Sequence, residues 1–149
     1  MSAAENKAIV RRFAEVIFDE KAFDRADDVA LTDYFDHGAM PGQLPGLHGA
    51  KQKWAMWVAG CPDLRVSIHH LFAEGDLVAM RWQADGTHTG ALLGLPPSGK
   101  HFHFAGMSIF RVADGKVAEQ WEAWDKLDLL QQLQLQGASG VVPAPEATH

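Results

Sequence analysis

The chain has 149 residues, enough for one domain with a substantial core, and its 47% apolar and 21% charged residues are typical of folded globular proteins. Its net charge of −6 and its lack of a basic stripe argue against nucleic acid as a partner. No signal-peptide pattern and no apolar run of about 18 residues is present, so we expect a cytoplasmic protein without a membrane partner. The single cysteine, Cys61, has no partner for an internal disulfide and is consistent with that compartment.

Helical signals dominate the first part of the chain. Ser2 and Glu5 have the spacing of a capping box, and apolar residues recur after them at helical intervals. Residues 38–49 contain four glycines and two prolines, which predicts a loop. The expected elements of this part are helices over residues 2–18, 23–31 and 50–60, and a short strand over 34–37.

Strand signals dominate the remainder, with hairpin turns at Gly75 and Gly115 and a closing helix from about Leu127. This order predicts an α+β fold in which a cone-shaped, curved antiparallel sheet wraps around the N-terminal helices and encloses an apolar interior. We expect a single domain over residues 1–136 and a disordered tail over 137–149. The expected strands cover residues 64–72, 77–89, 102–112 and 116–124.

The last of these strands carries a carboxylate, Asp125, at its end, just before the leucine-rich helix. Strand alternation puts Trp121 and Asp125 on one face, which we expect to point inward. A carboxylate enclosed by tryptophan is poorly solvated, which raises its pKa toward a value suited to proton transfer near neutral pH. The ordinary alternative is that Asp125 caps the following helix.

Other candidate residues for a ligand site come from the strands and from the third helix. Aromatic residues either fill the core or line a cavity, and the sequence leaves both interpretations open. Asp36 and His37, before the glycine-rich loop, form either an orienting pair or a solvated loop mouth. No metal site is expected, because His101 and His103 have no third ligand at a recognisable spacing. The remaining side chains expected to face the interior are Trp54, Trp57, Trp82, His88, Phe104 and Ser108.

Two stretches carry a resemblance to a known family. The first is Gly-Thr-His-Thr-Gly at residues 86–90, followed by Leu-Gly-Leu-Pro-Pro-Ser-Gly-Lys at 93–100. The second is Phe-Arg-Val-Ala-Asp-Gly-Lys-Val at 110–117, followed by Trp-Glu-Ala-Trp-Asp at 121–125 and Leu-Gln-Gln-Leu at 130–133. Together they resemble the SnoaL-like polyketide cyclase family, within the nuclear-transport-factor-two-like superfamily.

The resemblance implies a cystatin-like α+β barrel, often a homodimer, without a metal or organic cofactor. Such cyclases close a ring by intramolecular aldol condensation, and an aspartate that we match to Asp125 acts as their acid/base. They carry a histidine where this chain has Ser108, a glutamine near Gly106 and an asparagine near Asp36. These differences leave the substrate open.

The leading hypothesis is a cofactor-independent enzyme of lyase or isomerase type that acts on a small, apolar, enolisable carbonyl compound. Asp125 moves a proton on the carbon next to the carbonyl, and His88 or Ser108 stabilises the enolate oxygen. Asp36 or His37 assists at the cavity mouth. The aromatic residues that line the pocket in this hypothesis are Trp54, Trp57, Trp82, Phe104 and Trp121.

Two alternatives remain open. In one, the cone is a non-catalytic module that binds a hydrophobic small molecule, and Asp125 only caps the last helix. In the other, the protein is a hydrolase in which Asp36 and Asp125 activate one water molecule.

Overall fold

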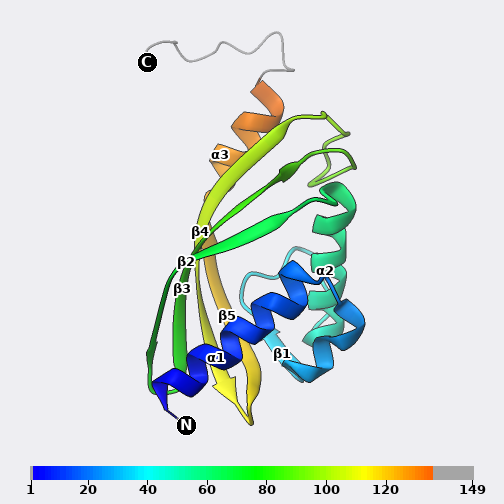
Figure 1. The fold of residues 1–149 in the computed structure, drawn as a ribbon. Helices are drawn as coiled ribbons and strands as arrows, with labels where there is room; N and C mark the ends of the chain where they lie inside the picture. Colours follow the sequence, from blue (N-terminus) through cyan, green and yellow to red (C-terminus); the bar gives the residue numbers. More distant parts are fainter. Residues whose placement is uncertain (1, 136–149) are drawn as a thin grey trace.

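A computed structural model describes residues 2–135 as a curved, five-stranded sheet with α1 and α2 packed on one side and α3 at one end (Figure 1). This architecture confirms the expected α+β cone. The strands are β1 (Ala30–Asp36), β2 (Arg65–Glu74), β3 (Leu77–Thr87), β4 (His101–Ala113) and β5 (Lys116–Trp124). The helical elements are α1 (Ala3–Ala14), η1 (Glu15–Asp19), η2 (Phe23–Asp28), α2 (Gly46–Gly60), α3 (Lys126–Leu130) and η3 (Gln131–Leu135).

The first helix begins at the predicted capping box. Ser2 Oγ accepts a hydrogen bond from the Glu5 amide at 3.0 Å, and Glu5 Oε1 accepts one from the Ser2 amide at 2.7 Å. Two otherwise unpaired backbone donors at the start of α1 are thereby satisfied. The expectation for this helix start is confirmed.

The same helical segment ends in a tight reversal at Lys21. The Ala22 amide donates to Val16 O at 2.9 Å, a bond that spans the turn at the end of η1. Lys21 has a φ of 53°, in the left-handed region, where glycine is the usual residue. For an L-residue this conformation costs about 1–2 kcal/mol.

The strand order is β1-β5-β4-β3-β2, and β2 to β5 are antiparallel neighbours as expected. Strand β1 adds to the edge in parallel with β5 and starts at Ala30, so the expected helix over 23–31 is wrong beyond the short η2. The reason is pairing with β5: the Val117 amide donates to Val29 O at 2.9 Å and draws this segment into the sheet.

The inner face of the sheet follows the predicted alternation in β3 and β4, where Trp82, Phe104 and Phe110 are among the buried side chains. In β5 the prediction is wrong. Val112 still pairs with Val117, but the next pair is Arg111 with Glu119, so Ala118 is an extra residue in the ladder. A bulge of this kind shifts every later side chain to the opposite face.

As a consequence of this bulge, the inward residues at the end of β5 are Gln120, Glu122 and Trp124. They pair with Phe110, Ser108 and Gly106 of β4, and directly opposed residues of an antiparallel pair share a face. Trp121 and Asp125 therefore do not point inward.

Within residues 2–135, no helix has the length and apolar character needed to cross a membrane. The tail that we expected to be disordered, residues 137–149, lies outside the described residues.

Candidate functional site

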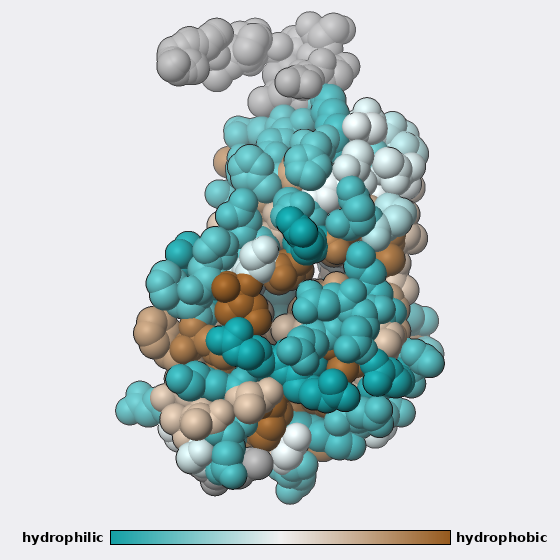
Figure 2. All heavy atoms as spheres, viewed as in Figure 1, coloured by the Kyte–Doolittle hydropathy of each residue, from teal (hydrophilic) through white to brown (hydrophobic). Residues whose placement is uncertain are grey.

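A cavity of about 90 Å³ lies between the helices and the inner face of the sheet. On the face drawn in Figure 2 the surface is hollowed beside the sheet, with brown hydrophobic side chains bordering the opening. Most of the cavity wall is aromatic or aliphatic. Its polar lining residues are Lys21, Lys53, Ser108, Gln120 and Glu122, and its aromatic ones are Phe18, Phe23, Trp54, Trp57, Trp82, Phe104, Phe110 and Trp124.

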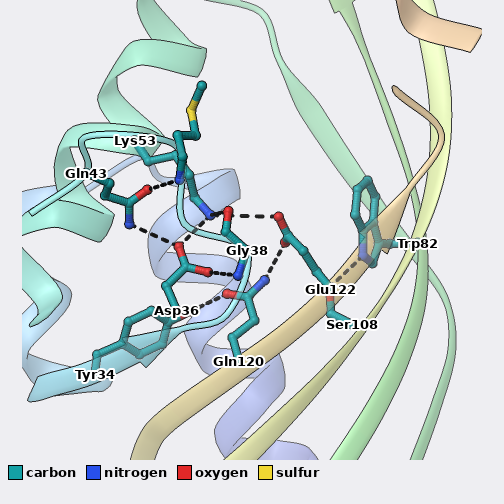
Figure 3. A network of polar contacts seen from close by, with 10 residues as sticks. Tyr34, Asp36, Gly38, Gln43, Lys53, Trp82, Ser108, Gln120 and Glu122 are labelled. Atoms are coloured by element: carbon teal, nitrogen blue, oxygen red, sulfur yellow. Dashed lines mark hydrogen bonds and ion pairs between the residues drawn. The ribbon is translucent and has the colours of Figure 1, made fainter. Parts of the chain in front are cut away.

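One end of the cavity is built around a buried cation. Lys53 reaches from α2 to lie between two carboxylates, Asp36 of β1 and Glu122 of β5 (Figure 3). Its Nζ is 2.6 Å from Asp36 Oδ2 and 3.7 Å from Glu122 Oε2. The side chains are 7%, 4% and 17% exposed for Lys53, Asp36 and Glu122 respectively, so solvent screens these charges little.

Asp36 is held in place behind the cavity wall by several hydrogen bonds. Its Oδ1 accepts from the Gly38 amide at 2.8 Å, and its Oδ2 accepts from Gln43 Nε2 at 3.1 Å as well as from Lys53. The bonds from Gly38 and Gln43 come from the loop that follows β1, and the bond from Lys53 comes from α2, so loop and helix together fix the carboxylate. Asp36 in turn fixes the position of the Lys53 ammonium.

Glu122 lines the cavity and belongs to a directional chain of hydrogen bonds. The Tyr34 hydroxyl donates to Gln120 Oε1, and Gln120 Nε2 donates to Glu122 Oε1 at 2.5 Å. Gly38 makes room for the carboxylate, since a Cβ there would lie 2.9 Å from Glu122 Oε2. Oε1 of Glu122 thus accepts from Gln120, while its Oε2 faces the Lys53 ammonium at 3.7 Å.

The environment of Glu122 shifts its acidity. Burial raises the pKa of its carboxyl above the ordinary value of 4.5; the Lys53 charge opposes this shift and the Asp36 charge adds to it. Burial, with the charges of Asp36 and Glu122, also raises the pKa of Tyr34 well above its ordinary value, so this phenol stays protonated and remains a donor. A carboxyl with a raised pKa in an apolar cavity is suited to accept and return a proton.

Ser108 supplies a second polar group on the wall. Its Oγ accepts a hydrogen bond from Trp82 Nε1 at 2.9 Å, so its own hydroxyl proton is free to donate toward the cavity. The Trp82 ring lies against the backbone of Gly106, where an added Cβ would come within 2.3 Å of Trp82 Cζ2. The absence of a side chain at Gly106 therefore sets the place of the indole.

The sequence pattern of the SnoaL-like polyketide cyclase family matches residues 8–133, which is most of the chain. The chain belongs to this family. A comparison with curated proteins found no match. The fold is thus that of a SnoaL-like domain.

Solved structures with the same fold support this assignment. TsrD from Streptomyces laurentii is 28% identical, with a TM-score of 0.77 over 85% of this chain and 96% of TsrD. IdmH from Streptomyces antibioticus is 27% identical, with a TM-score of 0.72 over 85% of this chain and 97% of IdmH. A SnoaL-like polyketide cyclase from Agrobacterium tumefaciens is 22% identical, covers 89% of this chain and 99% of its own, and with a TM-score of 0.74 shows the shared fold alone.

The structure brings together several of the side chains that we expected to form the site of this SnoaL-like domain. Asp36 does not line the cavity but contacts Lys53, which does. The expected wall residues that the structure places on the cavity are Trp54, Trp57, Trp82, Phe104 and Ser108.

Three of the expected residues, Trp121, Asp125 and His37, lie outside the cavity. Asp125 is exposed, and its Oδ1 accepts from the Asp128 amide at 3.0 Å, so it caps α3 as the ordinary alternative predicted. Trp121 stacks on His37 with 4.7 Å between ring centroids, and His37 Nε2 lies 2.6 Å from Glu119 Oε2. The bulge at Ala118 explains why Trp121 and Asp125 do not point into the cavity. His37 lies outside the cavity as well, because it stacks on Trp121.

His88 is buried, as expected, but it does not line the cavity. Its Nδ1 is 2.8 Å from Ser98 Oγ, and the His88 amide donates to Lys100 O at 2.9 Å. The segment that follows β3 therefore folds back onto His88 and holds its imidazole through Ser98. Among the described residues, no three His, Cys, Asp or Glu side chains are grouped to hold a metal ion, and His101 and His103 gain no third ligand.

The polar end of the cavity consists of Tyr34, Asp36, Lys53, Gln120 and Glu122. Sequence reasoning predicted Asp36 as a site residue and missed the other four. Lys53 gave a signal, because it follows Ala50 by three residues and precedes Trp54, which places a charge inside the apolar stripe of α2. Gln120 and Glu122 follow from strand pairing with β4 once the bulge is known. Tyr34 gave no such signal beyond its place in a short strand.

Proposed function

We propose that this protein is a cofactor-independent acid/base enzyme that acts on an apolar, enolisable carbonyl compound, either closing a ring by intramolecular aldol reaction or isomerising it. The observation that carries the proposal is the Glu122 carboxyl, which has a raised pKa and lies beside hydrogen-bond donors at the polar end of an aromatic cavity. Glu122 takes the acid/base role that the sequence suggested for Asp125.

In the first step, Glu122 Oε2 removes a proton from the carbon next to the substrate carbonyl, and the electron pair moves onto the carbonyl oxygen. The Lys53 ammonium and the Ser108 hydroxyl are placed to stabilise the negative charge that develops there. Both donors are fixed before the reaction, Lys53 by Asp36 and Ser108 by Trp82, so little reorganisation is needed.

In the second step, the enolate carbon attacks a second carbonyl of the same molecule, and a carbon–carbon bond forms. The oxygen of that carbonyl takes the proton back from Glu122, which restores the carboxylate. In the isomerisation variant, the proton returns to a different carbon of the same conjugated system. The aromatic wall suits a flat substrate and keeps water from quenching the enolate.

The binding-module alternative keeps specific support, since Asp125 is a helix cap and the cavity wall is largely apolar. The hydrolase alternative loses its basis, because Asp125 is exposed and does not share a cavity with Asp36. Enzyme and binding module differ in whether Glu122 exchanges protons with a bound carbon acid.

The test is deuterium incorporation next to the carbonyl of a panel of aryl ketones and β-keto esters, followed by proton NMR. We expect Glu122→Gln to slow exchange by about 10²–10⁴-fold. Asp125→Asn is the matched control, because it removes a carboxylate beyond the end of the same strand but outside the cavity. Exchange that persists in Glu122→Gln would refute the mechanism, and binding without exchange in the wild type would favour the binding module.

The proposal includes a homodimer formed through the outer face of the sheet. Phe72, Met107 and Ile109 point outward from β2 and β4 and are 66%, 63% and 43% exposed. Exposed apolar side chains grouped on one face mark an interaction surface. Light scattering at micromolar concentration should give the mass of two chains, and a monomer mass would contradict this part of the proposal.

A further inference from the structure

A second cation, Lys21, lines the cavity apart from Lys53. It lies in the connection between η1 and η2, and its Nζ donates to Pro62 O at 2.9 Å, just beyond the C-terminal end of α2. Lys53 lies seven residues before Gly60, the last residue of α2, a separation of roughly 10 Å at about 1.5 Å per residue. The side chain is only partly buried, so Lys21 lies where the cavity meets solvent.

The Lys21 ammonium keeps donors free for a ligand. An ammonium has three N–H donors, and the bond to Pro62 O uses one. Within residues 2–135, no carboxylate lies within ion-pair distance of Lys21, whereas Lys53 is flanked by two. A partly buried cation without a counter-ion, on the wall of a cavity, is a ready partner for an anionic group.

The backbone at Lys21 gives an independent observation. This residue has a φ of 53°, in the left-handed region, at the turn that follows η1, where glycine would be free of strain. Strained positions of this kind persist at ligand-binding sites, where the side chain offsets the local cost. The position is thus occupied by a residue that local folding does not favour, and its side chain points to the cavity.

We infer that Lys21 binds a carboxylate of the substrate at the cavity mouth, and this inference rests on the proposed function of the same cavity. The substrate is then an apolar keto acid whose carboxylate and reacting carbonyl lie on different parts of the molecule. Its carbonyl reaches Lys53 and Ser108 while its carboxylate pairs with Lys21, so the two cations fix the orientation of a flat molecule.

The test compares binding of 6-acetyl-2-naphthoic acid and its methyl ester by calorimetry at low salt, in a Glu122→Gln background where the ketone is not turned over. We expect the acid to bind about tenfold more tightly than the ester, with a preference that weakens as salt is added. Lys21→Met should abolish the preference without weakening the ester, and Lys21→Arg should keep it. Lys116→Met is the matched control, because Lys116 Nζ also donates to a backbone carbonyl, that of Asp27, but lies outside the cavity lining.

Lys21→Gly separates a binding role from a structural one. It removes both the ammonium and the left-handed strain, so we expect the acid preference to disappear while Tm does not fall. Equal affinity for acid and ester, a preference that survives in Lys21→Met, or no binding of either compound at about 1 mM would overturn the inference. None of these results depends on proton exchange, so failure here is distinct from failure of the acid/base mechanism.

Discussion

Lys53 is the cation that joins the two buried carboxylates of the polar end, and Lys53→Met removes its charge while keeping much of its length. Asp36 is then left as a buried carboxylate, 4% exposed, without its partner at 2.6 Å. Removing one member of a buried ion pair typically costs about 3–5 kcal/mol. Asp36 keeps its hydrogen bonds from Gly38 and Gln43, so we expect a loss near the lower limit, about 3 kcal/mol.

The cause of this loss is the stranded charge, so a second substitution that neutralises it should restore stability. In the double variant Lys53→Met/Asp36→Asn the amide keeps the shape of Asp36 but carries no charge. We expect the double variant to be less destabilised than Lys53→Met alone, with a coupling energy of about 2 kcal/mol between the two positions.

The assay is urea unfolding followed by tryptophan fluorescence at pH 7, with wild type, both single variants and the double variant at one protein concentration. A loss below about 1 kcal/mol for Lys53→Met, or single effects that simply add, would show that the charges are solvated in solution. Lys53 and Asp36 would then not form a buried ion pair, and this conclusion would hold whether or not the variants retain catalytic activity.

Three further predictions concern single residues. Because the pKa of Glu122 is raised above 4.5 in the folded protein, the folded chain keeps this proton at pH values where the unfolded chain has released it. The unfolding free energy of the wild type should therefore fall as pH rises from 4.5 through the raised pKa. Urea unfolding of Glu122→Gln at the same pH values should not show this decrease. Asp125→Ala should lower the unfolding free energy by about 1 kcal/mol in thermal unfolding and leave proton exchange unchanged, whereas Asp125→Asn should retain the cap on Asp128. Burial raises the pKa of the Cys61 thiol to about 11, so Ellman's reagent at pH 8 should label it only after unfolding, and rapid labelling of the folded protein would contradict its placement.

The sequence predicted most of the sheet because hairpin turns anchor the register of β2, β3 and β4. Alternation from those turns placed Trp82, Phe104 and Ser108 on the correct face. The bulge at Ala118 has no marker in its own residues, since alanine fits equally well in a regular strand, and it reversed the end of β5. Asp125, the acid/base candidate from the sequence, therefore lies outside the cavity, whereas Glu122, which we propose in its place, lines it.

The polar end could not be predicted for a different reason: its members come from β1, α2 and β5, which only the folded chain brings together. Lys53 was visible as a charge within an apolar stripe, but its partners were not. His88 was correctly predicted to be buried, yet burial alone did not tell whether it faces the cavity or the segment that covers it.

The contact between Gly106 and Trp82 means that a substitution at Gly106, which does not line the cavity, would change the width of the cavity by moving Trp82. A methyl group at position 106 would force the indole to shift, because the Cβ would lie within 2.3 Å of the ring. Such a change alters which molecules fit without replacing Glu122, Lys53 or Ser108. Because Trp82 Nε1 also donates to Ser108 Oγ, one backbone position that does not line the cavity couples the width of the cavity to the position of a proposed donor.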